Sequence, residues 1–588
     1  MGALLLANGC GRSGAENHSP LELGTLRGPG YLARDPSGSA GAEPTPTDGQ
    51  PPVSVEGAGP SEPKEVYPGE RAVLEVVERA CGGCHSADAD DPAGFLLSIN
   101  GLRDAGWLLP GYGEASPLAV WLQYGYGGAR PGHSRIDVQP GDYRAVVDFT
   151  DGMEVIHCSE PSPFGRDVAI EAMLRDLQAR DPADRPFIRY IGIQHASVRA
   201  RCGTYSVQDA ALVELLNAVS LGPSVVLPPL IETAYTHAID LRDYAWNRPI
   251  DLGWGTAAGT FPDAWEALVA MASPFAHELT GPEADALKLA TGTSVPYVPA
   301  HVFVAVASTG DLYHSLVGLG TDISATRDTL GVVDTGLRRA GMFGAAGPPG
   351  DRVVVRRVQG GKPERSWWTR EWVDVESDPG GLRSDPIGYP QSGSELMFEL
   401  PNGFFAFAIA ASDGSRVAQE PSCLGGVCDP PIAAASSVTC RACHGSGRLI
   451  LPADEVRAFA EANPSAYDTT TLSIVRDQYR PDELGALLTR DMQGYDAALE
   501  QLEGSRYYNL IGMVYHAFWR PLDAGEAAGE LGVTVDELRA AIPVVEPVGA
   551  RLAPWLGEGR VEREVFQASF RELACTIGGS RNLPAGCP

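Results

Sequence analysis

Two segments of the chain share one local pattern, in which two cysteines are separated by two residues and followed at once by a histidine. They are Cys81-Gly-Gly-Cys84-His85 and Cys440-Arg-Ala-Cys443-His444. Two thiols on one helical turn can add to the two vinyl groups of one haem, while the adjacent imidazole ligates the iron from the proximal side. A thioredoxin-like pair needs no following histidine, and a four-cysteine zinc site places its pairs roughly 15 to 20 residues apart. The spacing therefore predicts two covalently bound c-type haems, with His85 and His444 as proximal ligands.

The haem expected at Cys81 and Cys84, haem one, needs a distal ligand or an open iron. Methionine is usual in the loop before the last helix of a small cytochrome c domain, but no methionine lies between His85 and residue 150. Met153 comes after that helix, where it is poorly placed. His133, in Arg-Pro-Gly-His-Ser, is the candidate distal ligand. The alternatives are an exposed loop histidine and an open iron.

The distal ligand of haem two, expected at Cys440 and Cys443, is less constrained. His314 is the first candidate, and any of the others could instead be a core residue. His301 lies in an apolar run and is interpreted as packing or forming a local hydrogen bond. The further candidates are Met397, Met492, Met513, His195 and His516.

The remaining cysteines indicate export. Leu-Leu-Leu-Ala-Asn-Gly before Cys10 resembles the end of a bacterial lipoprotein signal, so Cys10 is a candidate lipid anchor. Six cysteines are then left, an even number that is typical of an oxidising compartment. Short loops close most readily, which favours Cys423 with Cys428, Cys575 with Cys587 and Cys158 with Cys202; buried free thiols are the alternative. We expect an exported protein of the periplasm, the outer membrane or the cell surface.

The charge of the chain limits its partners. With 75 acidic and 45 basic residues among 588, the formal net charge is -30. Such charge repels nucleic acid and anionic lipid and favours a basic redox partner. No run of some eighteen apolar residues follows the first segment, so membrane attachment is expected only through Cys10.

Composition and periodicity divide the chain. We expect a signal segment at 1–10, a disordered tether at 11–65 that is rich in Gly, Ser and Pro, and a cytochrome c-like haem domain at 66–156. A helical middle domain at 157–345, a strand-containing segment at 346–420 and a second haem region with C-terminal helices at 421–588 follow. The predicted fold class is mainly α, with two cytochrome c-like modules flanking a largely helical middle region and a small β-hairpin segment.

Individual elements follow from local patterns. Apolar residues at helical spacing predict a helix over 73–80 and another over 142–150, and further helices around 164–179 and 264–271. Ser206 to Asp209 and Thr534 to Glu537 read as capping boxes. Pro401-Asn402-Gly403 is a hairpin signal between strand-like segments.

Several segments together resemble a known family. They are Ile239 to Trp246, Thr291 to Tyr297, Leu312-Tyr313-His314 and Leu400 to Gly403 before the second haem motif. The chain from about 70 to 575 is similar to a family of large exported bacterial cytochrome c proteins, and its first haem module to the planctomycete-type cytochrome c domain. The resemblance implies two haems and export, and it implies no substrate. His133 departs from the pattern, because it stands in the loop that usually offers methionine.

Three functions are compatible with these features. The first is an electron-transfer protein with both irons six-coordinate. The second is a di-haem peroxidase-like or oxidase-like enzyme with one open iron, which the large middle region favours; no catalytic residue can be assigned. The third is a surface lipoprotein whose middle domain binds a ligand that the haems sense. The absence of a readable acid–base constellation favours electron transfer.

Overall fold

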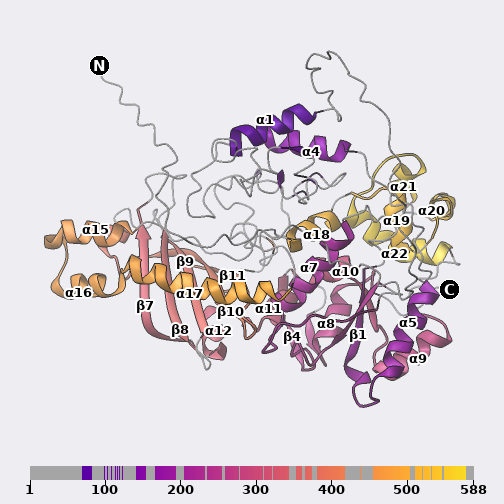
Figure 1. Ribbon diagram of the computed structural model, residues 1–588, viewed down its shortest axis with the longest axis horizontal. Coiled ribbons are helices and arrows are strands. Elements are labelled where there is room, and N and C mark those ends of the chain that lie inside the picture. Colours follow the sequence, from indigo (N-terminus) through magenta and orange to yellow (C-terminus); the bar gives the residue numbers. More distant parts are fainter. Residues whose placement is uncertain are drawn as a thin grey trace, which may run out of the picture. The chain divides into compact units, whose positions relative to one another are not determined.

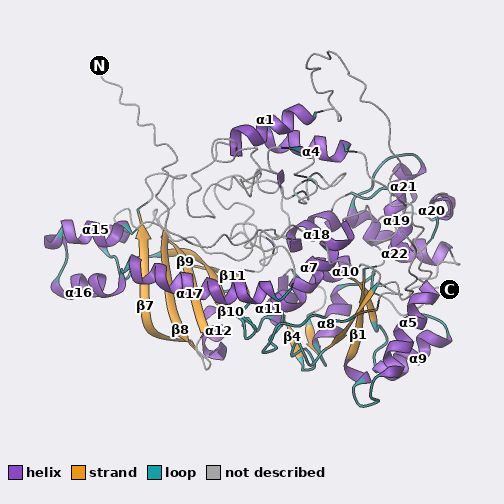
Figure 2. Cartoon of the chain, in the orientation of Figure 1, coloured by secondary structure: helices purple, strands orange, loops and turns teal. Residues whose placement is uncertain are grey.

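The computed structural model describes residues 69–81, 141–153, 166–193, 204–231, 235–253, 258–276, 279–308, 310–320, 322–330, 332–343, 353–360, 365–373, 381–417, 454–502, 510–519, 521–531, 533–545 and 549–577, with a few single positions between them. This part of the chain is mainly α-helical, with strands in three small sheets (Figure 1, Figure 2). It divides into unit 1, residues 1–119 and 137–154, and unit 2, residues 120–136 and 155–588. Within the described ranges, no helix has both the length and the apolar character needed to cross a bilayer.

The elements have the following bounds. The helices are α1 (Glu70–Cys81), α4 (Asp142–Gly152), α5 (Arg166–Ala179), α7 (Thr204–Ala218), α8 (Ala264–Met271), α9 (Pro282–Thr291), α10 (Ala300–Ala307), α11 (Gly310–Leu316), α12 (Ile323–Leu330), α13 (Gly381–Ser384), α15 (Glu455–Ala462), α16 (Thr469–Gln478), α17 (Pro481–Glu500), α18 (Leu510–Trp519), α19 (Ala524–Leu531), α20 (Val535–Ala541), α21 (Gly549–Leu552) and α22 (Arg563–Ile577). The strands are β1 (Ile188–Gly192), β2 (Leu230–Ile231), β3 (Thr236–Asp240), β4 (Ile250–Leu252), β5 (Gly259–Phe261), β6 (Tyr297–Pro299), β7 (Val332–Met342), β8 (Val353–Gly360), β9 (Arg365–Val373), β10 (Gln391–Glu399) and β11 (Phe405–Ala411).

Unit 1 contains the two helices that its apolar pattern predicts, α1 and α4, and they pack against each other. The Arg79 side chain forms an ion pair with Asp142, the first residue of α4. A carboxylate in the first turn also stabilises a helix N-terminus, so Asp142 supports both the start of α4 and its attachment to α1. The buried residues follow one face of each helix; they are Val73, Val76 and Val77 on α1, and Val146, Val147 and Phe149 on α4.

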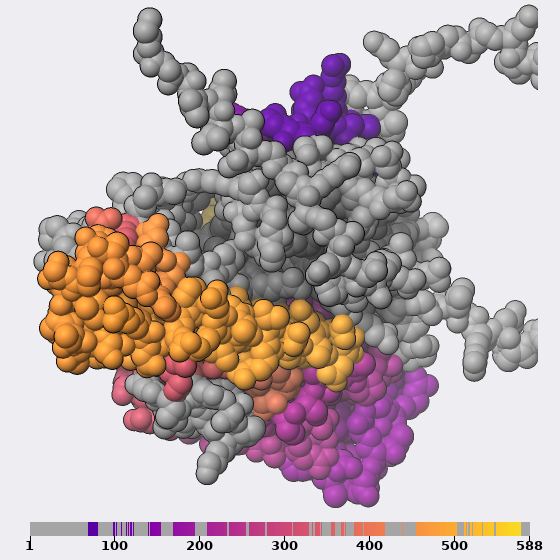
Figure 3. Space-filling view, turned by 60° about the vertical axis from the view of Figure 1, so that its left-hand side comes forward, coloured from indigo at the N-terminus to yellow at the C-terminus, as the bar shows by residue number. Residues whose placement is uncertain are grey.

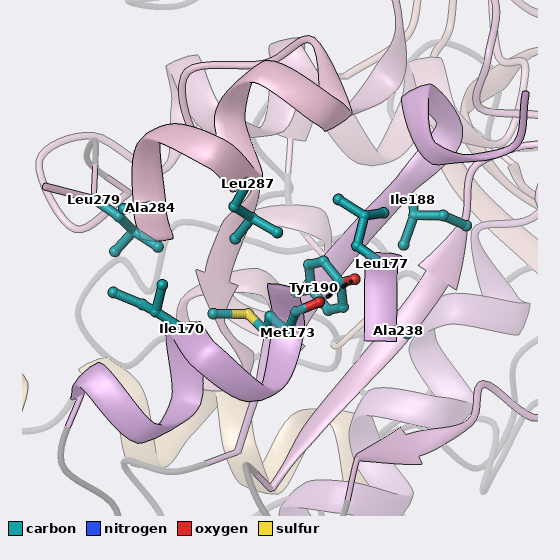
Figure 4. Packing of buried hydrophobic residues seen from close by; sticks show 9 residues of the cluster. All are labelled: Ile170, Met173, Leu177, Ile188, Tyr190, Ala238, Leu279, Ala284 and Leu287. Atoms are coloured by element: carbon teal, nitrogen blue, oxygen red, sulfur yellow. Dashed lines mark hydrogen bonds between the residues drawn. The ribbon is translucent and has the colours of Figure 1, made fainter. Parts of the chain in front are cut away.

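A four-stranded sheet in unit 2 has the order β2-β3-β1-β6, with β3 antiparallel and β6 parallel to β1. Alternate residues of these strands point to opposite faces of the sheet, and different helices pack on each face. Tyr190 and Ala238 contact α5 and α9 in one apolar cluster (Figure 4). His237, next to Ala238, points the other way and reaches Asp209 on α7. All five residues of β1 are buried, so its sequence lacks the polar alternation of a half-exposed strand.

A five-stranded antiparallel sheet in unit 2 has the order β11-β10-β9-β8-β7. Its two faces are covered by different helices. Arg357 on β8 and Trp368 on β9 are paired in register and both bond Asp491 of α17. Val354, of opposite parity, belongs to a cluster with residues of α13, α15 and α16. Figure 3 shows α15–α17 as a continuous orange band on one side of unit 2.

Three helices, α7, α10 and α18, pack on one another in the remaining core of unit 2. The C-terminal helices α19, α20, α21 and α22 form a further group, in which α22 contacts each of the other three. Thr534 and Glu537 form the predicted capping box of α20.

The fold agrees with the expected mainly α class, but strands are more abundant than the sequence predicts. The region 157–345, expected to be largely helical, holds both smaller sheets and β7, and the expected hairpin of 346–420 is part of a five-stranded sheet. The hairpin turn itself is confirmed between β10 and β11. The helix predicted from Ser206 begins at Thr204, so Ser206 does not cap it.

Candidate haem sites

The first cysteine of the first motif, Cys81, is the last residue of α1. The buried stripe of α1, held against α4, therefore leads directly to the motif. Cys84, His85 and His133 lie outside the described residues. Met153, which follows α4, is buried and 3% exposed.

The second motif lies outside the described residues, with Cys440, Cys443 and His444 all among those not described. Val438, two residues before Cys440, is buried. The described residues thus do not bring any two of the predicted haem-binding residues together, and both haem assignments stay predictions.

His314 is the candidate axial ligand that the structure describes in most detail. It lies on the short helix α11 and is 0% exposed. Burial, followed by the nearby Arg416 guanidinium, lowers the pKa of His314 to about 3. Its imidazole is therefore neutral at physiological pH. A histidine ligates a metal through a neutral ring nitrogen, so His314 has the protonation state that an axial ligand needs.

Contacts on both sides of His314 fix α11 in the fold. The Tyr313 hydroxyl accepts a hydrogen bond of 2.9 Å from the Phe407 N–H of β11. The Ser315 hydroxyl donates to the Asp251 carbonyl of β4 at 2.9 Å. Arg416, just after β11, forms a 2.7 Å ion pair with Asp311. A ligand on this helix would be held by bonds to two different sheets.

The other candidates for haem two differ in their surroundings. Met397 is buried on β10 and is paired in register with Trp368, so it shares the face that α17 covers. Met492 is half-buried on α17 itself. Met513 and His516 belong to α18, but their side chains lie outside the description, and so does His195.

His301 takes part in a local polar and aromatic cluster, as its sequence context predicts. Its Nε2 lies 3.6 Å from Glu530 Oε1, and its ring centroid is 5.7 Å from that of Phe518. Glu530 is in turn bound by Arg563 through two contacts of 2.6 and 2.8 Å. These contacts explain the buried position of His301 without a role as a haem ligand.

Sequence reasoning missed a buried histidine–carboxylate pair. His237 Nε2 lies 2.5 Å from Asp209 Oδ1, and His237 Nδ1 lies 3.0 Å from the Pro228 carbonyl oxygen. Both ring nitrogens thus face oxygen atoms, which is how a histidine that joins α7 to β3 satisfies its polar groups. The residues are 28 positions apart, and no motif links them.

Cys575, half-buried on α22, is disulfide-bonded. Its expected partner Cys587 lies outside the described residues, as do Cys10, Cys158, Cys202, Cys423 and Cys428. The three pairings and the lipid anchor stay predictions.

No cluster of three or more His, Cys, Asp or Glu side chains suited to a metal ion occurs in the described part of the chain. No family model, curated protein sequence or solved structure matches this chain. The functional assignment must therefore rest on the residues themselves.

Proposed function

We propose that this chain is an exported di-haem c-type cytochrome that transfers electrons in the bacterial cell envelope. The observation that carries the proposal is the repeated C-x-x-C-H motif at Cys81 and Cys440. The position of Cys81 at the end of a helix packed on a second helix supports it, because a packed helix that leads into the motif is expected of a cytochrome c-like haem module. The motif, and not a match to a known protein, is the basis of the assignment.

Within this proposal the haems supply iron that gains and loses one electron at a time. The chain's own residues hold and tune them. Cys81, Cys84, Cys440 and Cys443 would bind the haems covalently, and His85 and His444 would supply the proximal ligands. His133 is the proposed distal ligand of haem one, and His314 that of haem two. Burial favours the neutral imidazole of His314, the form in which a histidine ligates a metal.

The net charge and the segment before Cys10 indicate the partner and the location expected for this function. The net charge of -30 favours docking of a basic redox protein. Attraction between oppositely charged surfaces is screened over roughly 8 to 10 Å near physiological ionic strength, so added salt should weaken the complex. Lipidation of Cys10 would hold the protein at a membrane in the periplasm or at the cell surface.

The haem content tests the proposal directly. The pyridine haemochrome of the denatured wild type should give two haems per chain. Replacing Cys440 and Cys443 with alanine should halve that ratio, and so should replacing Cys81 and Cys84, because each pair holds one haem. The matched control is Cys575→Ala, which removes a cysteine outside both motifs and should leave two haems. A ratio unaffected by loss of either pair would refute the assignment.

Two further variants test the distal ligands by their visible and electron paramagnetic resonance spectra. His133→Ala and His314→Ala should each convert one iron from low spin to high spin and open it to cyanide. If His314→Ala leaves both irons low-spin, the ligand is one of the other candidates. His516→Ala and Met513→Ala are then the next variants to examine.

A further inference from the structure

The contact of His237 on β3 with Asp209 on α7 needs more hydrogen atoms than a neutral histidine supplies. His237 Nδ1 lies 3.0 Å from the Pro228 carbonyl oxygen, and His237 Nε2 lies 2.5 Å from Asp209 Oδ1. A carbonyl oxygen and a carboxylate oxygen are both acceptors, so each contact needs a hydrogen between its two atoms. A neutral imidazole carries a hydrogen on only one of its ring nitrogens.

The pair therefore holds one proton more than a neutral imidazole and an ionised carboxylate have together. The Pro228 carbonyl has no hydrogen to give, so the hydrogen of the ring itself lies on Nδ1. The additional proton lies between Nε2 and Asp209 Oδ1. Both side chains are largely buried, so water does not readily supply the missing hydrogen bond in place of that proton.

We propose that His237 and Asp209 are a pH-sensitive clamp, which holds α7 and the segment 226–229 against β3 while the pair keeps this proton. Loss of the proton would leave two buried acceptors facing each other without a hydrogen, which costs free energy. The contact should then open. The clamp does not depend on haem binding, so failure of either proposal leaves the other standing.

The segment 226–229 is attached at three points, and the clamp is the one that titrates. Asn217 of α7 donates to the Val226 carbonyl at 2.9 Å and accepts from the Val226 N–H at 2.8 Å. The Ala238 N–H of β3 donates to the Pro229 carbonyl at 3.0 Å. The third attachment is the contact of the Pro228 carbonyl with His237. Opening of the clamp should therefore loosen this segment without unfolding the sheet.

Asp209 is the titratable group that contacts the His237 ring in the described part of the chain. The residues paired with His237 on the neighbouring strands are Ile191 on β1 and Leu230 on β2, and neither carries a charge. Glu214, the other carboxylate of α7, lies five positions beyond Asp209 and therefore on a different side of the helix. The proton balance of the clamp thus depends on the His237–Asp209 pair.

Hydrogen exchange of the full-length protein, followed by mass spectrometry from pH 6 to pH 8.5, tests the clamp. A histidine in an open, solvated chain releases its proton near pH 6.5. Above that pH the closed pair holds a proton that the open form lacks, so the closed form loses stability as the pH rises. After correction for intrinsic exchange, the opening constant of peptides from 226–231 and 235–240 should rise by up to about tenfold per pH unit, which corresponds to about 1.4 kcal/mol.

Asp209→Asn is the decisive variant. The asparagine amide can donate to the free Nε2 of a neutral imidazole, so the contact keeps both hydrogen bonds without the additional proton. The opening constant of this variant should not change with pH above pH 6.5. At pH 8.5 the variant should protect these peptides better than the wild type does.

Asp491→Asn is the matched control. Asp491 is also a buried carboxylate, but its partners are Arg357 and Trp368, which keep their hydrogens throughout this pH range. This variant should loosen α17 by the same factor at every pH. The peptides from 226–231 and 235–240 should keep the pH profile of the wild type.

Two outcomes overturn the proposal. Parallel pH profiles in the wild type and Asp209→Asn would show that the pair holds no additional proton. Lower protection in Asp209→Asn than in the wild type at every pH would show that Asp209 is merely structural. If Asp209→Asn does not fold, His237→Gln decides the question, because it removes the titrating ring and should also give a profile that is flat above pH 6.5. Haem stoichiometry, by contrast, bears on the proposed function alone.

Discussion

Glu530 is a largely buried carboxylate, 12% exposed, and its neighbours stabilise its charged form. Burial favours the neutral acid, but Arg563 and His301 together outweigh burial and hold the pKa of Glu530 far below its usual range. The Arg563 guanidinium also lies 4.1 Å from the Phe518 ring centroid and donates to the Phe518 carbonyl at 2.7 Å. The cluster joins α10, α18, α19 and α22 through one charge pair.

The low pKa of Glu530 predicts a pH dependence of stability. The unfolded chain has the ordinary glutamate pKa of about 4.3, so below that pH it binds a proton that the folded state excludes. The pair should stabilise the fold above this value and lose that effect progressively as the pH falls. From pH 5 to pH 3, the free energy of unfolding should fall about 1 to 2 kcal/mol further in the wild type than in Glu530→Gln.

Denaturant unfolding of both proteins at several pH values in this window measures the difference. Covalent attachment, as proposed, would keep acid from releasing the haems during the experiment. Parallel stability curves for wild type and Glu530→Gln would contradict the prediction.

Ion pairs between residues far apart in the chain could not be predicted from the sequence. Glu530 and Arg563 are 33 positions apart, and Arg357 and Asp491 are 134 apart. No local pattern selects such partners, because the tertiary packing of separate elements brings them together. The two C-x-x-C-H motifs could be recognised in the sequence for the opposite reason, because their cysteines and histidine are near neighbours in the chain.

Helices with a clear cap or a one-sided apolar stripe were the elements that local patterns predicted best. The predicted helix over 264–271 has the same bounds in the structure, where the Asp263 side chain caps it by accepting from the Glu266 N–H. The strand β1 was missed because helices on both faces bury all of it, leaving no alternation to detect. The five-stranded sheet was recognised only in part, because long-range strand order does not follow from strand composition.

The turn between β10 and β11 provides a prediction about backbone conformation. Gly403 has φ +88°, in the left-handed region that costs a residue with a Cβ roughly 1 to 2 kcal/mol. Its N–H donates to the Leu400 carbonyl at 3.0 Å, and the Leu400 N–H donates to the Phe404 carbonyl at 2.7 Å. Gly403→Ala should therefore lower the free energy of unfolding by about 1 to 2 kcal/mol.

Gly485→Ala is the matched control for Gly403→Ala. Gly485 lies inside α17, and a Cβ added there meets no atom within 4 Å. The same chemical change should stabilise the protein by roughly 0.5 to 1 kcal/mol, because alanine favours the helix. Both values come from denaturant unfolding followed by circular dichroism. Effects of the same sign in the two variants would refute the conformational explanation.

At the scale of the whole molecule, the two haem motifs fall in different units. Cys81 belongs to unit 1 and Cys440 to unit 2. Unit 1 is small and has the helix pair expected of a haem module, whereas unit 2 contains three sheets and most of the described helices. A protein that only carries electrons needs little beyond its haem modules, so the size of unit 2 is the feature that most favours an enzyme.

The reaction with hydrogen peroxide separates these two functions. A peroxidase needs an iron with an open position, whereas distal ligation by His133 and His314 would leave both irons six-coordinate. We therefore expect negligible peroxide turnover by the half-reduced protein in stopped-flow mixing, together with rapid electron exchange with a basic redox protein that slows as salt rises. His314→Ala is the internal control, since an opened iron should react with peroxide faster than the wild type does. Wild-type turnover approaching tens per second, within the ordinary range of enzymes, would contradict the electron-transfer proposal and make unit 2 the catalytic part of a di-haem peroxidase.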